Sequence, residues 1–95
     1  MEPEEPPRAG HRIVLRPAAL RFVEKLRDEK LGRRLEDAFD KLAQEPRPPL
    51  AKLLANRDGI WRVRVGDYRV LYQIDDGESV VRILEIGHRR EIYRG

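Results

Sequence analysis

The sequence contains no cysteine among its 95 residues. That absence excludes disulfide bonds, thiolate metal ligands and a thiol nucleophile, and it is compatible with a reducing cytosol. No apolar run approaches the length of a membrane span, and the acidic, proline-rich start lacks the basic segment and apolar core of a secretory signal. We therefore expect a cytoplasmic protein with no membrane partner.

The common sequence signatures of enzymes are missing as well. The chain has no glycine-rich phosphate loop, no His-x-x-x-His or paired-cysteine spacing for a metal, and no Gly-x-Ser-x-Gly turn. Its carboxylates fall mostly on expected helix surfaces and in turns. We expect no metal site and no cofactor, so any chemistry must come from other residue types.

What the chain does have is charge. Apolar residues make up 40% and charged residues 39% of the sequence, which predicts one small domain with a thin core and a heavily charged surface. The first ten residues carry three glutamates and one arginine, so 19 of the 20 basic and 14 of the 17 acidic residues lie in the remaining 85. That surplus can attract a polyanion if the basic groups gather on one face. Most of the basic residues are arginine. A GC-rich or heat-adapted host that uses arginine broadly explains this enrichment in arginine equally well.

The first half of the chain predicts a tail, a strand and two helices. Residues 1–10 hold three prolines among charged and small residues, which indicates a disordered tail ahead of a single folded domain at residues 11–95. Residues 11–16 form a short edge strand that stops at Pro17, which opens a helix to about residue 28. A second helix, ended by Pro46, has an apolar face made of Leu31, Leu35, Ala38, Phe39 and Leu42.

The second half predicts a meander of strands. After a connector at residues 52–57, residues 60–65 alternate apolar and basic side chains, Gly66 and Asp67 suit a type II′ turn, and residues 68–74 form a central strand. A further strand covers residues 79–86, and residues 87–95 form a loop and a last extended segment. The fold class is therefore α+β: an N-terminal strand, a two-helix hairpin and a three-stranded antiparallel meander, with the helices on one sheet face and the other face free for a site.

Arginines gather on the expected hairpin. Arg62 and Arg64 share a strand face by the period of two, and Arg69 lies just past the turn. If the last segment folds back over this face, it adds Arg89, Arg90, Tyr93 and Arg94. Such cations repel one another, so a polyanionic ligand is one explanation. The alternative is a solvated face on which the arginines pair with Asp67, Glu85 and Glu91.

These residues carry a resemblance to a known family. Residues 52–53, the hairpin Trp-Arg-Val-Arg-Val-Gly-Asp-Tyr-Arg-Val-Leu-Tyr at residues 61–72, and Gly-His-Arg-Arg-Glu-Ile-Tyr at residues 87–93 resemble the signatures of RelE/ParE toxins of type II toxin–antitoxin systems. The likeness covers residues 13–94, because the order of helices and strands also matches that compact fold.

The RelE branch implies a metal-independent endoribonuclease that enters the ribosomal A site and cuts the codon there. The ribose 2′-hydroxyl attacks the adjacent phosphate and leaves a 2′,3′-cyclic phosphate. By this resemblance the catalytic residues are Arg62, Arg64, Arg69, Arg89 and Tyr93. Arginines can hold the phosphate and offset charge in the transition state, while tyrosine can stack on a base or exchange a proton.

One departure from the branch concerns the proton acceptor. Where RelE proteins often have lysines, this chain has Arg62 and Arg64, which cannot lose a proton near neutral pH. The general base is then Tyr93 or His88, although His88 also fits a turn and Tyr93 could pack on the sheet edge. The residues expected to contact RNA are Lys52, His88, Arg90 and Arg94, and those assigned to the core are Trp61, Tyr68 and Tyr72.

The resemblance also implies partners and alternatives. We expect a cognate antitoxin, acidic where it contacts this chain, together with the ribosome and mRNA; operator DNA would be reached only through the antitoxin. The first alternative is a ParE-like inhibitor of DNA gyrase with no nuclease activity. The second is a toxin fold that has lost toxicity and only binds a partner.

Overall fold

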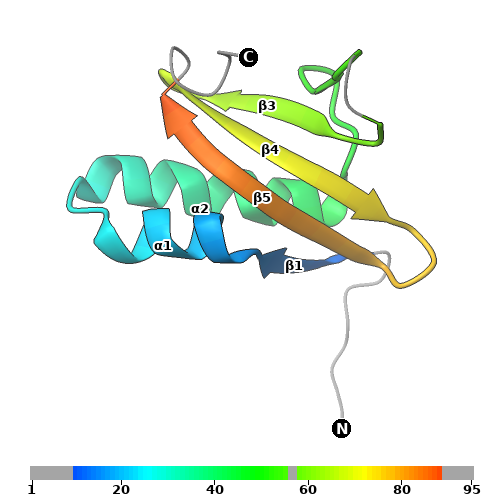
Figure 1. Ribbon diagram of the computed structural model, residues 1–95, viewed down its shortest axis with the longest axis horizontal. Coiled ribbons are helices and arrows are strands. Elements are labelled where there is room, and N and C mark those ends of the chain that lie inside the picture. Colours follow the sequence, from blue (N-terminus) through cyan, green and yellow to red (C-terminus); the bar gives the residue numbers. More distant parts are fainter. Residues whose placement is uncertain (1–9, 56–57, 89–95) are drawn as a thin grey trace, which may run out of the picture.

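The computed structural model describes residues 10–55 and 58–88. The chain forms β1 (Arg12–Leu15), α1 (Pro17–Lys25), α2 (Glu29–Gln44), β2 (Lys52–Leu53), β3 (Trp61–Val65), β4 (Tyr68–Asp75) and β5 (Val80–His88). One sheet has the strand order β1-β5-β4-β3-β2, in which β1 runs parallel to β5 and all other neighbours are antiparallel. α1 leads away from β1, and α2 returns in the opposite direction (Figure 1). The predicted α+β class, the edge position of β1 and the central position of β4 are confirmed.

Three boundaries differ from the sequence prediction. The expected connector at residues 52–57 contains a fifth strand, because Lys52 and Leu53 pair with Arg62 and Trp61. α1 ends at Lys25 and not near residue 28, because Asp28 caps α2 by accepting a hydrogen bond from the Leu31 N–H at 3.0 Å. β5 runs past the predicted end at residue 86, because Gly87 and His88 continue the pairing with β4.

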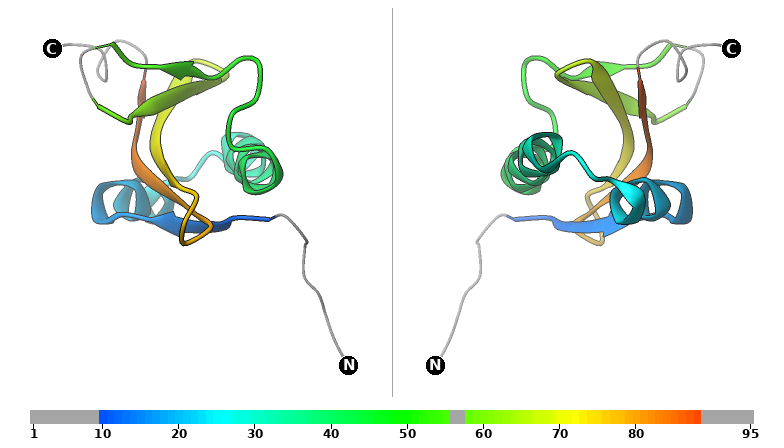
Figure 2. Two further views of the ribbon diagram at one scale, coloured as in Figure 1. Left: turned by 90° about the vertical axis from the view of Figure 1, so that its right-hand side faces the viewer. Right: turned by 90° about the vertical axis from the view of Figure 1, so that its left-hand side faces the viewer.

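The core lies between the helices and one face of the sheet. Ala19 from α1 and Leu35 and Leu42 from α2 belong to one cluster with buried residues of β3, β4 and β5: Val65, Val70, Tyr72, Val81, Ile83 and Ile86. Trp61 and Tyr68 pack against this cluster, which confirms the assignment of the three strand aromatics to the core. End-on views show α1 and α2 apart from each other (Figure 2), so the sheet holds both in place. No helix within the described residues is long and apolar enough to cross a bilayer.

Tyr72 anchors the segment after α2 to the middle of the sheet. Its side chain is fully buried, and its hydroxyl donates a hydrogen bond to the Pro46 carbonyl oxygen at 2.8 Å. Burial raises the pKa of Tyr72 to about 12, although the nearby Arg47 acts in the opposite direction. The neutral phenol is therefore the form that the fold accommodates.

We expect Tyr72→Phe to lower the free energy of unfolding by about 1 to 2 kcal/mol, because the buried Pro46 carbonyl loses its donor. Because the pKa of Tyr72 is raised in the folded protein, wild type loses stability as pH rises from the usual tyrosine value of 10.0 toward about 12, and the variant lacks that loss. Urea unfolding at neutral and alkaline pH measures both effects, with Tyr68→Phe as the control. If Tyr72→Phe has the same stability as wild type and the same loss of stability at alkaline pH, the hydrogen bond from Tyr72 to Pro46 contributes nothing to stability.

A second set of hydrogen bonds, centred on Asp76, joins the start of β1 to the β4–β5 turn. The two carboxylate oxygens of Asp76 accept hydrogen bonds from Arg47 Nη2 at 2.9 Å and from His11 Nε2 at 3.1 Å. The hydrogen bond from Arg47 and then that from His11 hold the pKa of Asp76 below its usual value. These two hydrogen bonds therefore require the ionised carboxylate of Asp76.

We expect Asp76→Asn to lower the melting temperature at neutral pH, because the amide cannot accept both bonds as an anion does. A depressed folded pKa gives stability that is present above the unfolded pKa and lost as pH falls through the folded pKa, so the gap between wild type and variant should close as pH falls below the usual Asp value of about 3.9. Thermal melts across this range test it, with Glu78→Gln on the same turn as control. A gap that stays constant down to the lowest pH would refute this account.

Candidate functional site

The β3–β4 hairpin sets the geometry of the site. Gly66 has a φ of 62°, whereas Ser79 alone has a positive φ among the non-glycine residues that the structure describes. A type I′ turn needs positive φ at both central residues, so a glycine first and Asp67 second make the predicted type II′ turn. Val65 and Tyr68 close it as a cross-strand pair.

This register brings the hairpin arginines together. Arg64 lies directly opposite Arg69, and Arg62 lies opposite Leu71 on one side and Lys52 on the other. Because directly opposed residues share a sheet face, all four cations point the same way. Val63, Val65 and Val70 alternate with them and belong to or pack on the core, so the cations occupy the face turned away from the helices. We call Lys52, Arg62, Arg64 and Arg69 the basic face.

The members of the basic face differ in exposure. Arg64 and Lys52 are exposed, whereas Arg62 and Arg69 are half-buried, with Nε of both and Nη1 of Arg69 shielded from solvent. Leu71, between Arg62 and Glu85 in the register, is only 1% exposed. Two arginines directly opposite each other destabilise a sheet. Arg64 has no ion pair within the described residues, so its guanidinium is available to an anion.

The expected alternative, in which carboxylates neutralise this face, stays a prediction, because Glu91 lies outside the described residues. Ion pairs elsewhere in the described residues join Asp76 to His11 and Arg47, and Asp75 to Arg82. These pairs belong to the β4–β5 turn and its surroundings, at the other end of β4 from the β3–β4 turn. Asp67 and Glu85 are both exposed.

His88 lies on the other side of the sheet. It pairs with Tyr68, and the two rings meet edge to face with centroids 5.5 Å apart. Tyr68 in turn contacts Phe22 of α1 at 5.8 Å. His88 therefore continues the aromatic packing beneath the sheet, and the register separates it from the basic face. The remaining expected site residues, Arg89, Arg90, Tyr93 and Arg94, lie outside the described residues.

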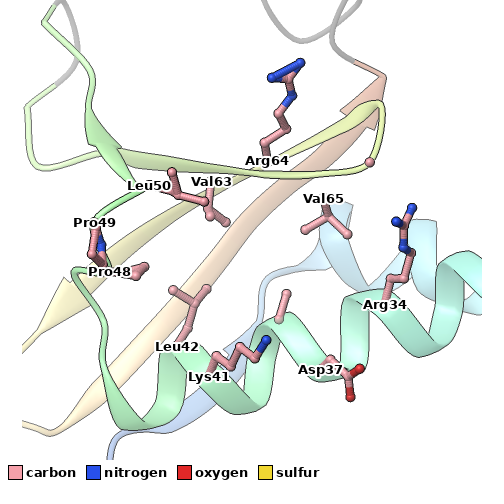
Figure 3. Close-up of a pocket in the computed structure, with 12 residues that line it drawn as sticks. Arg34, Asp37, Lys41, Leu42, Pro48, Pro49, Leu50, Val63, Arg64 and Val65 are labelled. Carbon is pink, nitrogen blue, oxygen red and sulfur yellow. The ribbon is translucent and has the colours of Figure 1, made fainter.

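The sequence reasoning missed one cation beside the hairpin. Arg34 of α2 comes so close to the turn that a Cβ added to Gly66 would lie 2.9 Å from Arg34 Nη1. The apolar face predicted for the second helix does not include Arg34, and a contact between residues 34 and 66 leaves no local signal in the sequence. Arg34 also lines a groove between α2 and β3 together with Lys41 and Arg64 (Figure 3).

The described residues contain no group of three or more His, Asp or Glu side chains placed to hold a metal ion. What the site offers is fixed positive charge from guanidinium forks, two of them half-buried. Such groups bind phosphates in two-point contacts and stabilise negative charge without moving protons. The arrangement suits a phosphodiester backbone or a carboxylate-rich protein segment.

Comparison with known proteins decides the family. The family model described as "ParE toxin of type II toxin-antitoxin system, parDE" matches residues 13–93. This chain belongs to the RelE/ParE family of type II toxins. Toxin RelG of Mycobacterium tuberculosis is 42% identical over 79 residues, covering 80% of this chain and 87% of RelG. Toxin RelE of the same organism is 31% identical over 84 residues, covering 88% of this chain and 87% of that toxin.

A solved RelE/ParE structure supports the same assignment. The toxin–antitoxin complex RelBE2 from Mycobacterium tuberculosis contains a chain that is 35% identical, with a TM-score of 0.70, covering 84% of this toxin and 99% of that chain. Fold and family therefore agree for this RelE/ParE toxin over nearly all of its described residues.

Gly66 offers a test of the turn that aligns the arginines. We expect Gly66→Ala to lower the free energy of unfolding by at least about 1 kcal/mol, because alanine is strained at positive φ and its Cβ would press on Arg34. Gly59→Ala is the matched control, since Gly59 has a φ of 69° but nothing within 4 Å of an added Cβ. Chemical unfolding of both variants separates the backbone cost from the Arg34 contact. Equal losses would mean that Arg34 gives way freely.

Proposed function

We propose that this RelE/ParE toxin is a ribosome-dependent endoribonuclease that cuts mRNA codons in the A site without a metal ion. The observation that carries the proposal is the basic face, where Arg62, Arg64 and Arg69 from two strands share one side of the sheet. The identity to RelG and RelE toxins over most of the chain supports the same branch.

In the proposed reaction the ribose 2′-oxygen bonds to the adjacent phosphorus, and the bond from phosphorus to the 5′-oxygen of the next nucleotide breaks. The products are a 2′,3′-cyclic phosphate and a 5′-hydroxyl. A base takes the proton of the 2′-hydroxyl, and an acid supplies one to the 5′-oxygen. Negative charge grows on the non-bridging oxygens, where fixed guanidinium groups stabilise it.

Roles follow from exposure. Arg64 is exposed opposite Arg69 and is suited to bind the scissile phosphate. Arg62 and Arg69, whose guanidinium groups are partly shielded from solvent, supply a fixed positive electrostatic potential. Lys52 extends the basic face by one strand and would contact a neighbouring phosphate. The proton-transfer role goes to Tyr93, and Arg89 joins the phosphate contacts. Arg90 and Arg94 would contact flanking RNA, whereas His88 is better explained by its packing on Tyr68.

The proposal extends to partners and place of action. The related RelBE2 structure is a toxin–antitoxin complex, so we propose a cognate antitoxin, encoded beside this gene, for the toxin domain at residues 11–95. The ribosome and its mRNA are the target, which places the protein in the cytoplasm. Operator DNA would be reached only through the antitoxin, and no cofactor takes part.

Purified toxin, programmed ribosomes and sequencing of RNA ends test the activity. We expect wild type to leave fresh cuts within A-site codons. Arg69→Ala or Tyr93→Ala should lower the cleavage rate by at least about 100-fold, as does removal of one donor from a charge-stabilising site. Arg33→Ala, which removes an exposed arginine from α2, is the control and should cut normally. Full activity of both site variants would falsify the assignment.

The family model is named for ParE toxins, so gyrase inhibition is the second candidate function. It predicts DNA damage signalling after induction, with transcript ends unchanged. Neither cuts nor DNA damage would indicate a toxin fold that acts only as a binding partner.

A further inference from the structure

A groove runs between α2 and β3 on the helix side of the hairpin (Figure 3), with a volume of about 600 Å³. Its floor is aliphatic and is formed by Ala38, Leu42, Val63 and Val65. Its rim carries two cations and one carboxylate, Arg34, Lys41 and Asp37, whereas the Arg64 guanidinium points away from α2 on the other side of β3 (Figure 3). The groove therefore favours an occupant with apolar groups at its centre and negative charge at its border.

The same groove borders an incomplete sheet edge. β2 pairs with β3 only at Trp61 and Arg62, so the last three residues of β3 have no strand partner on that side within the described residues. Pro48 and Pro49 divert the chain, because they have no N–H to donate and the Ala51 N–H bonds to the Pro48 carbonyl at 3.0 Å. Leu50 is left 81% exposed beside the groove.

Backbone alternation shows what this edge presents. In a two-residue hairpin the closing pair, here Val65 and Tyr68, exchanges hydrogen bonds with each other. The N–H and C=O of Arg64 must then point away from β4, toward the open edge. The Leu54 N–H, which bonds to the Ile60 carbonyl at 2.8 Å, follows the same alternation. The edge thus offers one donor and one acceptor at Arg64.

We infer that this groove binds an extended, acidic segment of the cognate antitoxin, which adds to the sheet as a short strand along β3. The residue opposite Arg64 shares its face and is acidic, since opposite charges stabilise a directly opposed pair. The residues before and after it point to the helix side and are apolar, over Val63, Val65 and Leu42. Further carboxylates meet Arg34 and Lys41.

The observations favour a protein segment over RNA in this groove. No aromatic ring lines it, so a nucleobase finds no stacking surface among the described residues, and Asp37 repels phosphate. An open strand edge recognises peptide backbone, which RNA does not have. This inference rests on the antitoxin part of the proposed function, whereas it is independent of whether the toxin cuts RNA.

The test uses the toxin with its co-expressed cognate antitoxin and measures dissociation constants for single charge reversals. Arg34→Glu and Lys41→Glu should each weaken binding about tenfold or more, because both would face a carboxylate. Arg33→Glu is the matched control: it changes the same charge on the same helix, but Arg33 lines a different groove with Val23 and Leu26. It should alter the affinity by less than about twofold.

Hydrogen exchange of backbone amides tests the added strand directly, which the charge-reversal variants do not. In the wild-type complex the Arg64 amide should exchange at least about tenfold more slowly than in the free toxin, because it donates to the added strand. Equal weakening by Arg33→Glu and Arg34→Glu, or an Arg64 amide that stays unprotected, overturns the inference. If an oligoribonucleotide protects the Arg64 amide from exchange and the antitoxin does not, the inference is also overturned, and the groove is then an RNA-binding site. If the toxin does not cut RNA but the variants change antitoxin binding as expected, only the proposed nuclease activity is refuted.

Discussion

The register of the β3–β4 hairpin is the constraint on which the rest of the site depends. Gly66 fixes a two-residue turn, so Val65 must lie opposite Tyr68 and Arg64 opposite Arg69. A slip by one residue would turn the arginines toward the helices and the valines toward water. The hairpin therefore has one stable pairing, and that pairing gathers the cations.

Core burial is strong enough to impose this arrangement on groups that repel each other. Like charges directly opposite cost about 0.2 to 1 kcal/mol, whereas full burial of a valine is worth about 1.5 kcal/mol or more. Val65 and Val70 are 7% and 0% exposed, so their burial outweighs the repulsion between Arg64 and Arg69. The fold can thus hold a preformed positive field in the absence of any ligand, which is what electrostatic stabilisation of a reacting phosphate requires.

Local patterns carried most of the fold and only part of the site. The alternation in β3 and the Gly66–Asp67 pair predicted the hairpin, its turn type and the shared face of Arg62 and Arg64, because each signal spans only a few residues. The short strand β2 escaped prediction because two residues have no period and depend on Trp61 for pairing. The side of the sheet that His88 occupies depends on pairing across β4 with Tyr68, and the contact of Arg34 with the turn depends on how α2 packs. Neither is encoded near the residue itself.

Arg64 connects the two proposed binding modes physically. Its guanidinium belongs to the basic face, while its backbone borders the groove beneath β3. A strand added at this edge would place a carboxylate beside that guanidinium and occupy its donors. A phosphate needs the same donors, so antitoxin and RNA would compete at one residue even though most of their contacts lie on opposite faces of the sheet. Competition at a shared residue makes each ligand weaken the other by the same factor, and inhibition then needs no change in the shape of the toxin.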